Sequence, residues 1–244
     1  MFFVKKNIKI ELIKKKMKSL NIANPNILNF LAYSFPLSFI LGNLFINIVT
    51  LLIILFGFYI YKEKLFDFKK DSILTYIFLF FVLLLISTII ENNENHIIKS
   101  VLFLRYFFLL LVLRCMIING DLNIKKFFLI CLTFSIIISL DVIFQYFVGV
   151  NIFGQESTIQ HRSSFFGSEK IAGGYIQRFL ILGLFSIPLF LSKNKKKLFI
   201  ILGSITTIGF IGIILSGNRM PAILFIFFII LSLIFNIENL NLLI

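Results

Sequence analysis

Two arginines far apart in the chain stand in surroundings that suit phosphate binding. Arg162 precedes a predicted helix at 171–192, with Gly167 in the turn between them. The start of a helix presents free backbone N–H groups and a partial positive charge. Arg219 lies in the short turn 216–219, and a guanidinium can hold two phosphate oxygens at once. We predict phosphate contacts for both arginines, with contacts to lipid headgroups as the alternative for each.

Three further charged residues, Arg105, Asp141 and Arg178, lie inside apolar segments. A charge in hydrocarbon is costly, so such residues usually pair with one another or line a polar cavity. At a rise of about 1.5 Å per helical residue, all three reach a similar depth below the same membrane face. Gln145 follows Asp141 by one turn on the same side of its helix. We predict an ion cluster of the three, which either fixes helix packing or forms the floor of an outward-facing cavity.

The elements that carry these residues are predicted to be membrane-spanning helices. Of the 244 residues, 59% are hydrophobic and 14% are charged, and the mean hydropathy is +1.01. Water-soluble domains are nearer about half apolar and about a quarter charged, so that class is excluded. A formal net charge of +13 would suggest nucleic acid in a soluble protein. Here the charge fits membrane topology, because cytoplasmic loops collect lysine and arginine, and we expect no nucleic-acid partner.

Apolar runs of about 20 residues predict eight spanning helices, and therefore an all-α transmembrane bundle. The runs lie at 27–42, 44–61, 72–90, 97–118, 126–149, 171–192, 198–216 and 220–236. The first two are separated only by Gly42-Asn43, a pair that suits a tight turn. If the two runs formed one helix, the orientation of every later helix would be reversed.

The distribution of lysines supports two separate helices at the start. With eight spans, the basic segments share one side of the membrane, and these are the N-terminus, 62–70, 125–126 and 193–197. The sparsely charged connections share the other side, and these are 91–96, 150–170 and 216–219. By the positive-inside rule the N-terminus is cytoplasmic. Arg162 and Arg219 are then extracytoplasmic.

One membrane domain is predicted at 27–236. The basic segment 1–26 before it is either a helix on the anionic inner leaflet or a disordered tail. Residues 237–244 turn apolar again and resemble a truncated end. With 2 Cys on the predicted reducing side and 2 His, we expect neither a disulfide nor a metal site, and no cofactor.

Two segments together resemble the signatures of the O-antigen ligase and O-antigen polymerase superfamily. The first reads Arg162-Ser163-Ser164-Phe165-Phe166-Gly167-Ser168-Glu169 and continues with Gly173-Gly174-Tyr175. The second reads Leu215-Ser216-Gly217-Asn218-Arg219. Order, spacing and outward side agree with the family, whereas Asn218 and Met220-Pro221 depart from its pattern. The resemblance implies that 27–236 is the first part of a longer bundle.

The family moves a glycan from an undecaprenyl diphosphate carrier to lipid A core or to another repeat unit. It does so without metal, at the periplasmic face of the bacterial inner membrane. The resemblance implies that Arg162 and Arg219 stabilise the diphosphate as it leaves, since that group gains negative charge. Lys170, Tyr175 and Arg178 are further substrate-binding candidates.

Glycan transfer also needs a base that takes the proton of the acceptor hydroxyl. Glu169 and His161 are the titratable residues near Arg162 and are therefore our candidates. The base proposed for the family belongs to a later segment that this chain lacks.

The alternative function is a polytopic transporter or flippase, in which Asp141 and the arginines line a path through the membrane. An inactive truncated fragment is a third hypothesis. A recess at the outer face that holds Arg162 and Arg219 would favour the transferase. A central passage through Asp141 would favour transport.

Overall fold

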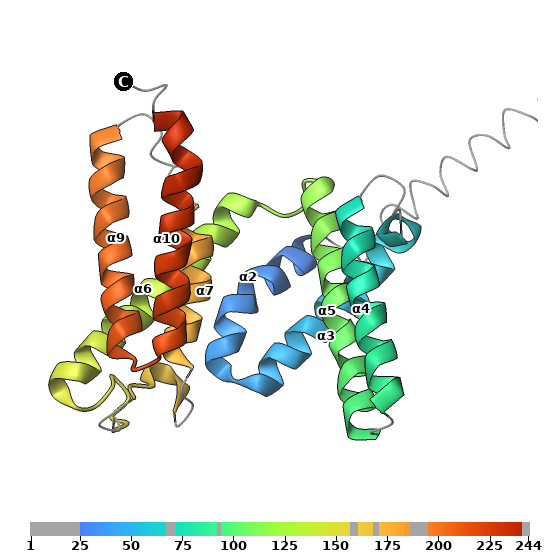
Figure 1. Ribbon diagram of the computed structural model, residues 1–244, viewed down its shortest axis with the longest axis horizontal. Helices are drawn as coiled ribbons and strands as arrows, with labels where there is room; N and C mark the ends of the chain where they lie inside the picture. The colour runs from blue at the N-terminus through green and yellow to red at the C-terminus, as the bar shows by residue number, and fades with distance from the viewer. Residues whose placement is uncertain are drawn as a thin grey trace, which may run out of the picture. The chain divides into compact units, whose positions relative to one another are not determined.

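The computed structural model describes residues 25–66, 72–91, 94–156, 161–167, 171–185 and 195–240, and most of these residues are helical. Its long helices are α2 (Pro25–Leu41), α3 (Asn43–Tyr61), α4 (Ser72–Glu91), α5 (Glu94–Ile118), α6 (Ile124–Val148), α7 (Ala172–Leu184), α9 (Lys195–Leu215) and α10 (Arg219–Leu240) (Figure 1). Two short 3-10 helices are η1 (Lys62–Phe66) and η2 (Ser164–Phe166). A helix therefore occupies each of the eight predicted intervals, and the all-α fold class is confirmed.

Four of these helices are long and apolar enough to cross a membrane. They cover Asn43–Tyr61, Ile73–Glu91, Asn95–Ile118 and Ile124–Val148. Three shorter apolar helices cover Asn26–Leu41, Ile200–Leu215 and Arg219–Ser232. The class of helical membrane protein is thus supported, while the count of eight spans and the cytoplasmic N-terminus stay predictions. The basic N-terminal residues 1–24 lie outside the described residues.

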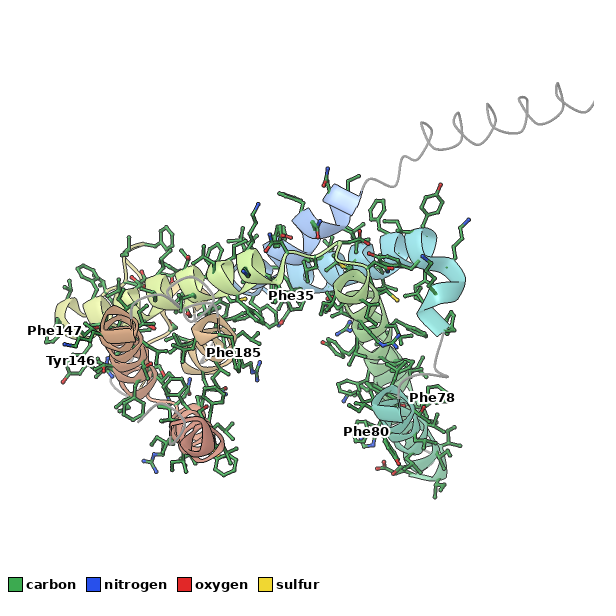
Figure 2. The ribbon with its side chains drawn as sticks, turned by 90° about the horizontal axis from the view of Figure 1, so that it is seen from above. Phe35, Phe78, Phe80, Tyr146, Phe147 and Phe185 are labelled. Atoms are coloured by element: carbon green, nitrogen blue, oxygen red, sulfur yellow. The ribbon has the colours of Figure 1, made fainter. Side chains whose placement is uncertain are left out.

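Large aromatic side chains point away from the helices, as expected of a surface that faces lipid. Figure 2 shows Phe80 on α4 and Phe147 near the end of α6. Phe80 is 57% exposed and Phe147 is 77% exposed. Soluble monomers rarely expose contiguous apolar patches of this kind. These surfaces therefore fit a protein whose solvent is hydrocarbon.

Helix ends follow from local sequence. Gly42 has φ of +103° and separates α2 from α3, which confirms the predicted break at this pair. The side chain of Asn123 accepts a hydrogen bond from Lys126 N and caps the start of α6. Gly149 ends α6 in the left-handed conformation, where glycine carries no Cβ penalty.

The chain forms two compact units. Among the described residues, the first unit contains 25–32 and those within Thr50–Leu122, and the second contains Tyr33–Val49 and those from Asn123 onward. In the first unit, α4 packs along α5, and the hydroxyl oxygens of Thr88 and Ser100 are 2.9 Å apart. At the end where α3 and α5 finish, the Tyr61 hydroxyl donates to Asp121 Oδ2 at 2.7 Å.

In the second unit, α6 packs against α7 and α9, and α10 packs against α7 and α9. Glycines make the close approaches possible. A Cβ at Gly183 of α7 would lie 2.6 Å from Leu132 Cα of α6, and a Cβ at Gly212 of α9 would lie 2.9 Å from Ser139 Cβ of α6. Small residues are the usual means by which membrane helices come into contact.

Gly183→Ala should therefore destabilise the second unit, because the new methyl group meets the backbone of α6. We expect the free energy of unfolding to fall by about 1–3 kcal/mol. Gly203→Ala in α9 is the control, since nothing lies within 4 Å of its Cβ position. Its helix propensity should raise stability by about 0.5–1 kcal/mol. Thermal unfolding in detergent measures both, and equal shifts for the two variants would contradict the packing described.

Candidate functional site

Three connections meet at one end of the second unit, namely those between α2 and α3, α6 and α7, and α9 and α10 (Figure 1). Arg162 N donates to Ser216 O at 3.3 Å, which joins the α6–α7 connection to the α9–α10 turn. Asn43 of the α2–α3 turn and Asn218 of the α9–α10 turn line one recess. The two segments that resemble family signatures are therefore brought together in space.

Gly173 explains how closely these segments join. A Cβ at this position would overlap Ser216 Oγ and lie 3.1 Å from Asn218 Cβ. The first turn of α7 therefore lies directly on the α9–α10 turn. Ser216 is 1% exposed, and its hydroxyl donates to Ile213 O at 2.6 Å. Of the Gly173-Gly174 pair, only Gly173 is needed for this close packing, since Gly174 has no comparably close neighbour.

Arg162 is half-buried and holds the α6–α7 connection against α9. Its Nη1 donates to Leu215 O at 3.0 Å, at the last residue of α9. The guanidinium carbon lies 4.6 Å from the centre of the Tyr146 ring, within the range of a cation–π contact. A cation at the negative end of a helix is also stabilising. Its Nε has no hydrogen-bond acceptor among the described residues.

Arg219 is exposed and begins α10. It lines a recess of about 980 Å³, the first recess, together with His161, Ile214, Gly217, Asn218, Met220, Pro221, Ala222 and Ile223. The structure therefore places His161 and Arg219 at one recess. Arg162 lines neither this recess nor the second one, so the structure places one arginine, Arg219, at the first recess and not the expected pair of facing arginines.

A second recess, of about 450 Å³, adjoins the first, because Asn218 and Pro221 line both. Its other lining residues are Phe39, Asn43, Ile46, Ile171, Gly174, Tyr175, Arg178 and Phe179. Arg178 is exposed. Tyr175 is 4% exposed, and its hydroxyl donates to Pro36 O at 3.0 Å. Tyr175 thus joins α7 to α2 and contributes to a wall, whereas Arg178 supplies the charge of this recess.

Asp141 does not form the predicted ion pair with Arg178 within the described residues. It is 1% exposed, and its carboxylate accepts from Ile152 N at 3.0 Å and from the Ser164 hydroxyl. The Asp141 carboxylate is therefore hydrogen-bonded by uncharged donors of the loop after α6. The hydrogen-bond partners of Asp141 are therefore Ile152 and Ser164 rather than Arg178, and the ion cluster of the three residues stays a prediction.

Arg105 belongs to the first unit and has aromatic neighbours. Its Nη2 donates to the Tyr106 hydroxyl at 3.1 Å, and its guanidinium carbon lies 4.9 Å from the centre of the same ring. Its predicted place in the ion cluster stays a prediction, since Arg105 and Asp141 fall in separate units. Glu169 and Lys170 lie outside the described residues.

Asn151 and Ser164 organise the loop after α6, although no role for either was predicted from the sequence. Asn151 Oδ1 accepts from Phe153 N at 3.0 Å and from Gln155 N at 2.8 Å. Its Nδ2 donates to Ser164 O at 2.6 Å. An asparagine three residues before a glycine, here Gly154, is favoured in a type I turn, and that was the signal available in the sequence.

No group of three His, Cys, Asp or Glu side chains that could hold a metal ion occurs in the described ranges. No family model, no curated protein and no solved structure matches this chain. Any function must therefore be argued from the recesses and from the residues that build them.

Gly173→Ala should separate α7 from the α9–α10 turn and disturb both recesses. We expect it to lower the free energy of unfolding by about 1–3 kcal/mol, as overpacking does. Gly174→Ala is the control in the same turn of the same helix, because its nearest neighbour, Pro221 Cγ, is 4.0 Å away. Thermal unfolding in detergent compares the pair. A Gly174→Ala variant as unstable as Gly173→Ala would show that the tight contact is not the cause.

Proposed function

We propose that the protein is a membrane glycan transferase of the O-antigen ligase type. It would take a glycan from an undecaprenyl diphosphate carrier at the periplasmic face of the bacterial inner membrane and join it to lipid A core or to a growing polysaccharide. The observation that carries the proposal is the first recess, which is lined by Arg219 of the second segment that resembles a family signature and by His161, the residue directly before the first such segment. Its volume of about 980 Å³ lies at the upper end of the range for small-molecule sites.

The reaction requires stabilisation of a leaving diphosphate. The acceptor oxygen forms a bond to the anomeric carbon while the bond from that carbon to the diphosphate breaks. Negative charge therefore grows on the diphosphate in the transition state, and a fixed cation beside it lowers the barrier. Arg219 meets the requirement because it is exposed within the recess and stands at the start of α10, where the helix adds partial positive charge.

The other candidates take supporting roles around Arg219. His161 lines the same recess and is our choice for the base that takes the acceptor proton. Arg178 offers a second cation to the substrate from the adjoining recess. Arg162 acts by holding the connection that carries His161 against α9. Glu169 and Lys170 keep their predicted roles as base and substrate-binding residue.

The transport alternative is less well supported by these observations. It needs Asp141 beside a path for ions or substrate. Asp141 lines neither recess, and the loop after α6 occupies both of its carboxylate oxygens. A carboxylate fully engaged in this way serves packing rather than conduction.

Arg219→Ala should lower the kcat of glycan transfer by about 100-fold or more, the usual cost of losing a donor at a developing anion. Arg219→Lys should recover little, because an ammonium lacks the two-point contact with phosphate. The measurement is transfer from an undecaprenyl diphosphate-linked glycan by membranes that contain each variant, with the amount of inserted protein checked in parallel. Met220→Ala is the control at the neighbouring position of the recess and should leave kcat within a few-fold. Unimpaired transfer by Arg219→Ala would refute the proposal.

A further inference from the structure

Ser164 has the most constrained backbone of the α6–α7 connection. It is 0% exposed and has φ of +52°, a region that residues other than glycine rarely adopt. Such a conformation persists only when the surroundings impose it, and residues of this kind cluster at functional sites.

Every polar group of Ser164 is engaged. Its N–H donates to Gln145 Oε1 at 3.1 Å, its hydroxyl donates to Asp141 Oδ2, and its carbonyl accepts from Asn151 Nδ2. Asp141 and Gln145 lie one turn apart on α6, and both are almost completely buried. Two side chains of one helix therefore fix both the backbone and the side chain of a single loop residue.

The chain just before Ser164 carries the site residues. Arg162, two residues earlier, bonds to Leu215 O and Ser216 O at the end of α9. His161, next to Arg162, lines the first recess with Arg219. The segment 161–164 is thus anchored at Ser164 to α6 and at Arg162 to α9. The direction in which the chain enters Ser164 determines where His161 lies.

We propose that Asp141 and Gln145 are positioning residues that place His161 at the first recess by holding Ser164 in its left-handed conformation. Asp141 also accepts from Ile152 N, so one carboxylate holds both the start of the connection and Ser164, twelve residues later. The effect on catalysis rests on the proposed function. The placement of His161 does not, and it can be measured without substrate.

The test of placement is the reactivity of a thiol at position 161. In a His161→Cys protein, the rate of modification by a membrane-impermeant maleimide reports how freely this segment moves. Cys115 and Cys131 are both buried, and the parent protein without the His161 change gives their background. Adding Ser164→Ala removes the bond to Asp141, and hydrogen bonds to charged groups are worth enough that we expect about a tenfold faster modification.

Ser135→Ala is the matched control. Ser135 is also 0% exposed, but its hydroxyl donates only to Leu132 O of its own helix. The rate should stay within about twofold of the His161→Cys parent, since losing a local bond of this kind leaves the loop untouched. Equal rates in the Ser164→Ala and Ser135→Ala proteins would overturn the proposal.

Asp141→Asn and Asp141→Ala separate hydrogen bonding from charge. Asparagine keeps an oxygen that can accept from Ile152 N and a group that can bond to the Ser164 hydroxyl, whereas alanine keeps neither. In the His161→Cys protein, we expect the modification rate to be lowest with Asp141, higher with Asp141→Asn and highest with Asp141→Ala. If Asp141→Ala fails to fold, the Ser164→Ala protein still tests the idea, because it removes the same bond from the loop side. A rate for Asp141→Ala equal to that of the His161→Cys parent would overturn it.

Transfer activity, measured in the protein with His161 intact, then tests the consequence. Ser164→Ala should lower kcat by about tenfold with little change in KM, because the substrate still finds Arg219 while the base is misplaced. If Ser164→Ala speeds the thiol reaction but leaves kcat unchanged, Asp141 and Gln145 do position His161, but His161 is not a catalytic residue. If wild-type protein shows no transfer at all, the proposed function fails, while the thiol rates still decide the placement.

Discussion

The buried carboxylate of Asp141 is the constraint on which the arrangement of the second unit depends. It is 1% exposed in an apolar core, where an unpaired charge is costly. A carboxylate only accepts hydrogen bonds, and the N–H groups around it on α6 are used by the helix itself. Donors must come from another segment, and Ile152 N and the Ser164 hydroxyl supply them. The chain after α6 therefore has to fold back over its own helix, which delivers His161 and Arg162 to the α9–α10 turn.

The helices could be predicted because the membrane imposes their length and composition, and because Gly42-Asn43 is a recognisable break. The packing could not. In α6 apolar residues cover all sides, so periodicity marks no face for contact. Gly183 and Gly212 meet α6, whereas Gly203 meets nothing within 4 Å. The sequence does not distinguish these glycines, and only the tertiary structure shows that Gly203 has no close neighbour.

The candidate site was predictable to a similar degree. Arg219 and His161 could be placed at one end of the bundle because both stand in predicted connections on one side. The hydrogen-bond partners of Asp141 were not predicted, because a positively charged partner was expected. A carboxylate satisfied by a backbone N–H and a serine hydroxyl leaves no charge pattern in the sequence. Likewise, the sequence predicts that Arg162 lies near the second segment, but it does not show that the Arg162 guanidinium donates to Leu215 O.

The turn between α9 and α10 joins two helix ends of opposite sign, and this explains how both arginines can matter although one faces the recess. The last carbonyls of α9 carry partial negative charge, whereas the first N–H groups of α10 carry partial positive charge. Left alone, these ends would largely cancel for an anion bound at the turn. Arg162 occupies the negative end through its bond to Leu215 O. In the proposed function, the positive end of α10 and the exposed guanidinium of Arg219 would then act together, so Arg162 would strengthen the anion site that Arg219 forms at the recess.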